Sequence, residues 1–126
     1  AHRLGLGVLL DVVYNHLGPE GNYFRDFGPW FTQTARTPWG DPFNLDGPGS
    51  DAVRHFFLQN ALRWQDEFHL DGLRLDAVPF IKDASPEHLL AEMARVTQAE
   101  ARRLGRPFLL IAESDLNDAR MLRPPA

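Results

Sequence analysis

The order of strand-like and helix-like segments is the feature of this sequence that most limits its fold. Short apolar runs at 7–14, 70–78 and 108–113 have the character of buried strands. Between them, segments 51–68 and 85–104 carry apolar residues three and four positions apart, which indicates amphipathic helices. Strands that alternate with helices pair in parallel through right-handed crossovers. The sequence therefore predicts an α/β fold with a parallel sheet.

Polar and glycine residues set the expected ends of the helices. Ser50 is expected to cap the first long helix, because its hydroxyl can accept from a free backbone N–H. Ser85 followed by Pro86 predicts the start of the second, and Gly105 its end. Residues 1–5 resemble the tail of a helix closed by glycine.

Composition narrows the class of protein. The chain has 126 residues, of which 44% are hydrophobic and 24% charged, as in an ordinary globular domain. Its net charge of -4 is spread along the chain, which argues against nucleic acid or an anionic membrane as a partner. It has no cysteine, so disulfides and thiolate metal sites are excluded. Because no signal-peptide pattern opens the sequence either, we expect a cytoplasmic protein.

Each of the three expected strands ends on polar residues. Asn15 and His16 end the first, Asp76 the second and Glu113 the third. The carboxyl ends of parallel strands meet at one edge of the sheet, and such folds place their chemistry there. A shared site therefore explains these residues better than three unrelated polar ends.

The second strand carries an opposite charge pair, Arg74 and Asp76. Side chains alternate along a strand, so this pair lies on one face while Leu73 and Leu75 lie on the other. Burying two charges costs more than their attraction readily returns, so such a pair is a weak stabiliser. The pattern alone leaves open a structural ion pair at a strand end and a catalytic role.

Asp76 and Glu113 together suggest hydrolysis of a glycosidic bond. Carboxylates about 5 to 5.5 Å apart can act as nucleophile and proton donor in a reaction that retains configuration. Arg74 would keep Asp76 ionised, which favours it as the nucleophile, and the apolar residues before Glu113 suit a general acid. Magnesium binding is the alternative, but no phosphate-cradling glycine loop accompanies these carboxylates.

The other polar and aromatic candidates have weaker signals. Asp11 is expected to pair with Arg74 or a backbone amide, and His16 could donate to a sugar hydroxyl or be a satisfied buried imidazole. The long connection at 17–50 should be ordered, because it is rich in aromatic residues. These could stack on sugar rings, but we expect most to pack the loop on itself. They are Tyr23, Phe24, Phe27, Trp30, Phe31 and Trp39.

Three motifs resemble, in order and spacing, the first three signature regions of the alpha-amylase superfamily of glycoside hydrolases. They are Asp11-Val-Val-Tyr-Asn-His16, Gly72-Leu-Arg-Leu-Asp-Ala-Val78 and Ile111-Ala-Glu113. The resemblance implies that 1–126 is part of a catalytic (β/α)8 TIM barrel, about strands 3 to 5, with the long βα loop at 17–50. It implies that Asp76 is the nucleophile and Glu113 the acid/base.

The same resemblance implies roles for the surrounding residues. Arg74 would position Asp76 and, with His16 and Tyr14, contact the substrate, while Asp11 and Asn15 would support the site. The resemblance makes calcium possible through the Asn15 region, but the acidic loop ligands that calcium usually needs are not evident, and we expect no cofactor.

Within the superfamily, the chain looks most like members that release trehalose from malto-oligosyltrehalose by cleaving the neighbouring α-1,4 bond. Pro79 and Phe80 stand where many alpha-amylases have Lys-His, which suits a leaving group such as trehalose. A glucan branching enzyme or another transglycosylase of the superfamily, and a non-catalytic glycan-binding homologue, remain as alternatives. The segments that carry this closer likeness are Gly18-Pro-Glu-Gly-Asn-Tyr23, Thr37-Pro-Trp-Gly-Asp41, Asp46-Gly-Pro-Gly-Ser50 and Glu113-Ser-Asp-Leu-Asn117.

The ends of the sequence suggest a piece of a longer barrel. It starts without methionine, and 123–126 has the character of a connection. The superfamily's fourth region, with its third carboxylate, would lie beyond Ala126. We therefore expect exposed strand edges and no activity from this piece alone.

Overall fold

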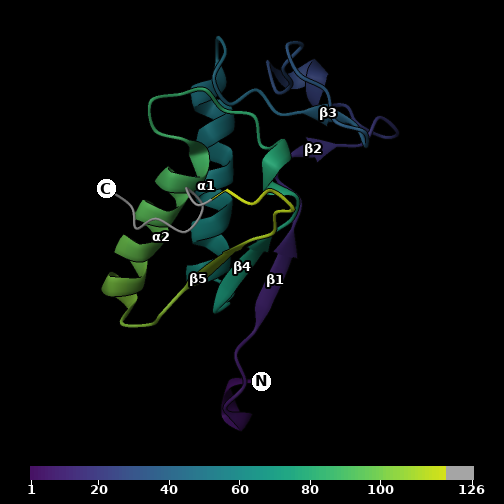
Figure 1. The fold of residues 1–126 in the computed structure, drawn as a ribbon. Helices are drawn as coiled ribbons and strands as arrows, with labels where there is room; N and C mark the ends of the chain where they lie inside the picture. Colours follow the sequence, from purple (N-terminus) through teal and green to yellow (C-terminus); the bar gives the residue numbers. More distant parts are fainter. Residues whose placement is uncertain (119–126) are drawn as a thin grey trace.

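The computed structural model describes residues 1–118 and has a three-stranded parallel sheet at its centre (Figure 1). The strands are β1 (Leu9–Val12), β4 (Gly72–Leu75) and β5 (Leu109–Ala112), in the order β1-β4-β5. Two helices, α1 (Ser50–Asp66) and α2 (Leu89–Leu104), pack against each other and cover one face of the sheet. The predicted α/β fold with a parallel sheet is confirmed. The expected ending at 123–126 lies outside the described residues.

The register of the sheet decides which side chains meet. Asp11 of β1 pairs with Arg74 of β4, which in turn pairs with Ile111 of β5. Leu73 and Leu75 point to the helices and are 0% and 2% exposed. The alternation predicted for this strand is therefore confirmed.

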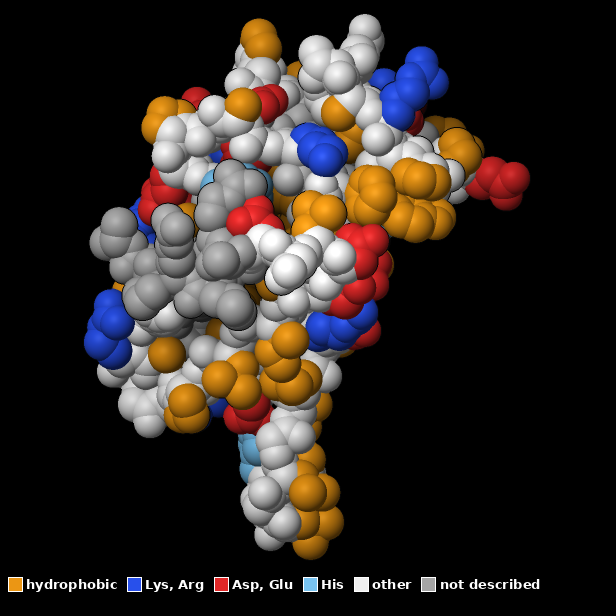
Figure 2. All heavy atoms as spheres, viewed as in Figure 1, with side chains coloured by type: hydrophobic (Ala, Val, Ile, Leu, Met, Phe, Trp, Pro, Cys, Tyr) orange, Lys and Arg blue, Asp and Glu red, His pale blue; other side chains and the backbone are white. Residues whose placement is uncertain are grey.

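The opposite face of the sheet is open. The side chains of Arg74 and Asp76 are 36% and 35% exposed there, so the expected buried charge pair is instead half-exposed. Leu9, Leu109 and Ile111 are exposed on the same strands, and Figure 2 shows apolar side chains at the surface over them. In the part of the chain that the structure describes, no element covers this face with a second layer.

Two expected helix starts are wrong. Ser50 is the first residue of α1 and makes no side-chain cap, while Gly49 takes the cap position with a left-handed φ of 76°. The second helix begins at Leu89, later than Ser85 and Pro86 suggest, and His88 caps it by accepting from the backbone N–H of Leu90.

Asp83 explains the late start of α2. Its carboxylate accepts from Arg54 on α1 at 2.5 Å and from the backbone N–H groups of Ser85 at 2.9 Å and Leu89 at 2.6 Å. The Asp83 side chain is 0% exposed, so these donors satisfy a charge that would otherwise be costly to bury. Arg54 also binds Glu92 at 2.7 Å, which fixes the connection to the first turn of α2. This network holds 83–88 as a loop.

The long loop is ordered by a short ladder and by its own aromatic residues. β2 (His16–Leu17) pairs antiparallel with β3 (Asp41–Pro42) at its base. Phe31 stacks on Phe43 with centroids 5.4 Å apart, and Trp30 meets the edges of Phe24 and Phe56. Phe24, Trp30 and Phe31 therefore pack as expected. Tyr23, Phe27 and Trp39 are 69%, 81% and 52% exposed, so only half of the six named loop aromatics pack and the expectation for most of them is wrong.

Three 3-10 helices complete the described elements: η1 (His2–Leu4), η2 (Phe24–Phe27) and η3 (Val78–Phe80). Gly5 closes η1 in a left-handed conformation, as expected, although the element is a 3-10 turn. Among residues 1–118, no helix is long and apolar enough to cross a membrane.

The strands approach so closely at Gly72 that no room is left for a side chain. A Cβ added there would lie 2.4 Å from the carbonyl oxygen of Leu109 and 2.8 Å from Cδ2 of Leu9. Because the first contact is backbone, we predict that Gly72→Ala lowers the free energy of unfolding by about 1–3 kcal/mol. Urea unfolding of the full-length protein measures this. Gly18→Ala is the control, since a Cβ there meets nothing within 4 Å; equal midpoints for both variants would contradict the packing described.

Candidate active site

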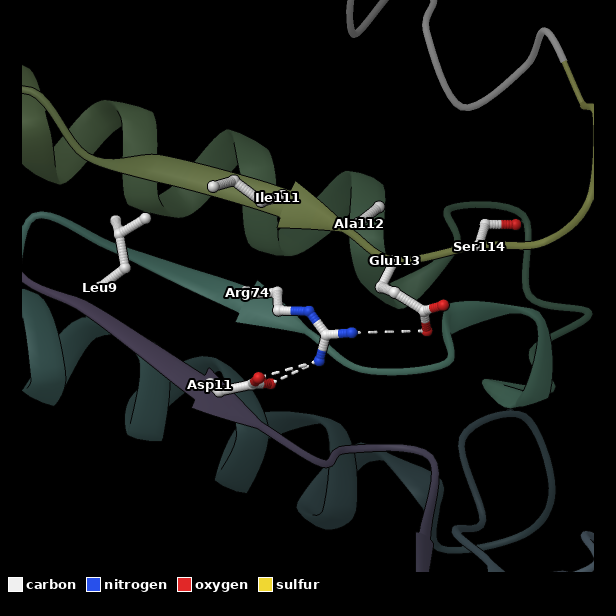
Figure 3. Close-up of a pocket in the computed structure, with 7 residues that line it drawn as sticks. All are labelled: Leu9, Asp11, Arg74, Ile111, Ala112, Glu113 and Ser114. Carbon is white, nitrogen blue, oxygen red and sulfur yellow. Dashed lines mark hydrogen bonds and ion pairs between the residues drawn. The ribbon is translucent and has the colours of Figure 1, made fainter.

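The guanidinium of Arg74 contacts acidic residues at or beside the ends of the three parallel strands, and Figure 3 shows it between Asp11 and Glu113. Arg74 Nη1 donates to Asp11 Oδ1 at 2.8 Å and Oδ2 at 2.9 Å, and to Asp76 Oδ1 at 2.9 Å. Its Nη2 lies 3.9 Å from Glu113 Oε2. The structure thus brings together Asp11, Arg74, Asp76 and Glu113, four residues that lie up to 102 positions apart in the sequence.

The acidic neighbours keep Arg74 positively charged. Its hydrogen bonds to Asp11, and then to Asp76, raise the pKa of the guanidinium above its ordinary value. Asp11 is a hydrogen-bond partner of Arg74, one of the two roles that the sequence suggested for it.

Glu113 is fixed by the peptide that follows Asp76. Its Oε2 accepts from the backbone N–H of Ala77 at 2.7 Å. Ala77 has a left-handed conformation, with φ 46° and ψ 49°, which costs a non-glycine residue about 1–3 kcal/mol. The apolar surroundings expected for Glu113 are not observed, because a cation and an N–H lie beside its half-exposed carboxylate. No sequence signal marks Ala77 for this role.

Asn15 and His16 follow the end of β1, and His16 begins β2, at the same edge of the sheet. The amide Nδ2 of Asn15 donates to the carbonyl oxygen of Asp76 at 2.7 Å, and its Oδ1 bonds to Nδ1 of His16. Asn15 is 1% exposed and His16 half-buried. The two residues are therefore tied to the backbone of the candidate nucleophile.

Trp39 stands beside this group, and sequence reasoning did not single it out from the other loop aromatics. Its ring lies 5.7 Å from that of His16 and meets Phe80 edge-on at 4.9 Å, measured between centroids. Trp39 is 52% exposed, unlike the packed Phe31 and Phe43. The turn residues Pro38 and Gly40 on either side were the only hint that this ring sits at a loop tip.

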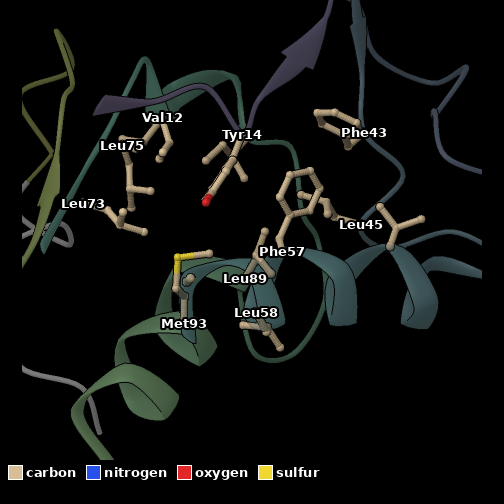
Figure 4. Packing of buried hydrophobic residues seen from close by; sticks show 14 of the residues in the cluster. Val12, Tyr14, Phe43, Leu45, Phe57, Leu58, Leu73, Leu75, Leu89 and Met93 are labelled. Carbon is tan, nitrogen blue, oxygen red and sulfur yellow. The ribbon is translucent and has the colours of Figure 1, made fainter. Parts of the chain in front are cut away.

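Tyr14, expected to contact substrate, lies among the buried apolar side chains of the core in this structure (Figure 4). It is buried, its hydroxyl donates to Asn60 Oδ1, and its ring lies 4.9 Å from that of Phe57. Burial raises the pKa of Tyr14 well above its ordinary value. Tyr14 shares the core-facing side of its strand with buried Val12, and the period of two could have indicated this.

The site opens as a hollow on the uncovered face of the sheet. Polar groups at one end and apolar side chains at the other suit a ligand that has both kinds of surface. Within residues 1–118, no group of three or more His, Asp and Glu side chains is arranged to hold a metal ion. The hollow is lined by Leu9, Asp11, Arg74, Ile111, Ala112, Glu113 and Ser114.

Comparison with known proteins gives the relatives of this chain. It is 54% identical over 125 residues to malto-oligosyltrehalose trehalohydrolase of Arthrobacter ramosus, and 53% identical over 124 residues to that of Saccharolobus solfataricus. The matches cover 99% and 98% of this chain. The chain is homologous to part of the malto-oligosyltrehalose trehalohydrolases. It spans about a fifth of the length of these relatives, 22% and 21%.

Two other comparisons place this family in its superfamily. An alpha-amylase-like protein from Salmonella typhimurium has a crystal structure that matches with a TM-score of 0.78 and 42% identity, over 90% of this chain and 19% of that one. The glucan branching enzyme of Bacillus mycoides is 33% identical over 78% of this chain and 17% of its own. No family model matches the sequence.

The placement of Tyr14 gives a second prediction. Tyr14→Phe removes the hydroxyl that bonds Asn60, so the free energy of unfolding should fall by about 1 kcal/mol, the typical worth of one hydrogen bond. The KM of the full-length protein for its substrate should not change, because the hydroxyl bonds Asn60 on the core-facing side. Thermal unfolding and steady-state kinetics of the full-length protein measure both quantities. A several-fold rise in KM with unchanged stability would instead put Tyr14 at the substrate.

Proposed function

We propose that this chain is part of a retaining glycoside hydrolase that releases trehalose from malto-oligosyltrehalose. The bond cleaved is the α-1,4 bond next to the trehalose unit. The observation that carries the proposal is the contact of one guanidinium, that of Arg74, with both Asp76 and Glu113 at neighbouring strand ends. Relatives about half identical to this chain carry the corresponding name.

The three parallel strands then correspond to strands 3 to 5 of a (β/α)8 barrel, with 1–126 as part of its catalytic domain. The helices on one face would form the outer layer, and the open face would turn to the barrel interior. This accounts for the exposure of Leu9 and Ile111, which would pack in that interior in the whole protein. The chain alone would lack the opposite wall of the site, and we expect it to be inactive.

Asp76 would attack the anomeric carbon. Arg74 holds Oδ1, so the attack would come from Oδ2. The hydrogen bond from the guanidinium limits the rotation of this carboxylate and so orients the nucleophile. The Oδ2 to anomeric carbon bond forms as the bond to the leaving oxygen breaks, which gives a glycosyl ester on Asp76.

Glu113 would supply and then recover the proton. Because the N–H of Ala77 holds Oε2, the proton would be carried on Oε1. The acid protonates the leaving oxygen of trehalose, and the resulting carboxylate takes a proton from the water that hydrolyses the ester. Two displacements at one carbon retain its configuration.

His16, Trp39 and Phe80 would bind sugar around this centre. A half-exposed tryptophan next to a second aromatic ring offers an apolar surface on which a sugar ring can stack. His16 lies between this surface and the backbone of Asp76, where it can reach a sugar hydroxyl. We propose malto-oligosyltrehalose, or a malto-oligosaccharide, as the molecule bound.

A branching enzyme is the second candidate, favoured by the weaker similarity to the Bacillus mycoides protein. It would use the same two carboxylates but pass the glycosyl group to another glucan. Product analysis of the full-length protein separates the two reactions. Free trehalose from malto-oligosyltrehalose supports the hydrolase, and new branch points without trehalose support the transglycosylase.

Substitution of the carboxylates tests the mechanism. Glu113→Gln should lower kcat by about 10²–10⁴-fold, the usual contribution of a general acid and base, and Asp76→Asn should lower it at least as much. Asp66→Asn is the matched control, because this carboxylate lies at the end of α1 and pairs with Arg103. Trehalose release is the measurement. If Asp76→Asn kept turnover within about tenfold of the wild type, Asp76 would not be the nucleophile.

A further inference from the structure

Asn15 is a buried link between His16 and the backbone of Asp76, and its chemistry fixes which way its amide points. The amide atom 2.7 Å from the carbonyl oxygen of Asp76 must be the nitrogen, because a carbonyl oxygen only accepts hydrogen bonds. The oxygen Oδ1 therefore faces Nδ1 of His16. Asn15 is 1% exposed, so water does not compete for these groups.

This orientation fixes the proton on His16. An amide oxygen cannot donate, so Nδ1 of His16 must carry the hydrogen of the bond between them. A neutral imidazole has one N–H, which leaves the lone pair on Nε2. We propose that Asn15 is a positioning residue that holds His16 in the Nδ1–H tautomer and makes Nε2 a hydrogen-bond acceptor. The donor role suggested by the sequence is thereby reversed.

The surroundings of His16 keep the ring in place for this role. Asn15 bonds one edge of the imidazole, and Trp39 lies against it with a centroid distance of 5.7 Å and an interplanar angle of 32°. Through the same amide, the position of the ring is tied to the carbonyl of Asp76. Nε2 would then receive a hydrogen bond from a substrate hydroxyl, a step that rests on the proposed function.

His88 provides a reference in the same molecule. Its Nδ1 accepts from the backbone N–H of Leu90 at 3.2 Å, so this nitrogen carries the lone pair. The neutral ring then has its hydrogen on Nε2. His16 and His88 should therefore hold opposite tautomers under identical conditions.

Neutron crystallography of the full-length protein, grown from heavy water at about pH 8.5, where an ordinary imidazole is neutral, locates these hydrogens directly. The proposal predicts a deuteron on Nδ1 of His16 and none on Nε2, with the reverse for His88. A deuteron on Nε2 of His16, with or without one on Nδ1, would overturn it. This measurement does not depend on activity, so it can succeed even if the protein releases no trehalose.

A double-mutant cycle tests whether Asn15 acts through His16. Asn15→Leu has nearly the same shape but no polar group, and it should lower kcat/KM for malto-oligosyltrehalose at least about tenfold. In a His16→Ala background the same substitution should cost about tenfold less, because no imidazole remains to be oriented. A purely structural Asn15, acting on the Asp76 carbonyl alone, would give equal losses in both backgrounds and contradict the proposal.

Discussion

The contact of Arg74 with its acidic neighbours is the interaction on which the rest of the site depends. Asp11, Asp76 and Glu113 come from three adjacent strand ends, and without a cation between them their like charges would repel. Since the cluster is half-exposed, it adds little to stability and instead sets where each carboxylate lies. The parallel register makes the contact possible by placing Arg74 level with Asp11.

Much of the fold could be predicted from local patterns. The strands, the helices and the buried side of β4 follow from the period of apolar residues, which reports burial directly. The start of α2 could not be found this way, because it is set by Asp83 and its bond to Arg54, 29 positions earlier in the chain. A serine followed by proline is a local signal, and this long-range charge pairing overrode it.

The sequence predicts the site residues that end strands. It does not predict contacts that depend on backbone conformation or on the path of a loop. Asp76 and Glu113 come together because parallel strands end at one edge of a sheet. The left-handed turn at Ala77, which aims an N–H at Glu113, has no signature in the sequence. Trp39 is brought to His16 only by the path of the long loop. For Tyr14, by contrast, the alternation of side chains along a strand already predicts a position on the core-facing side.

Together these contacts support the proposal that Asp76 is the nucleophile of a retaining hydrolase and Glu113 its acid and base. Trapping the intermediate tests this most directly. The full-length protein would be treated with a fluorinated glucosyl fluoride, which forms the glycosyl ester but slows its hydrolysis, and then digested for mass spectrometry. We expect a single glycosylated peptide, modified on Asp76. Modification of another residue, or turnover that inverts the anomeric configuration without a trapped ester, would contradict it.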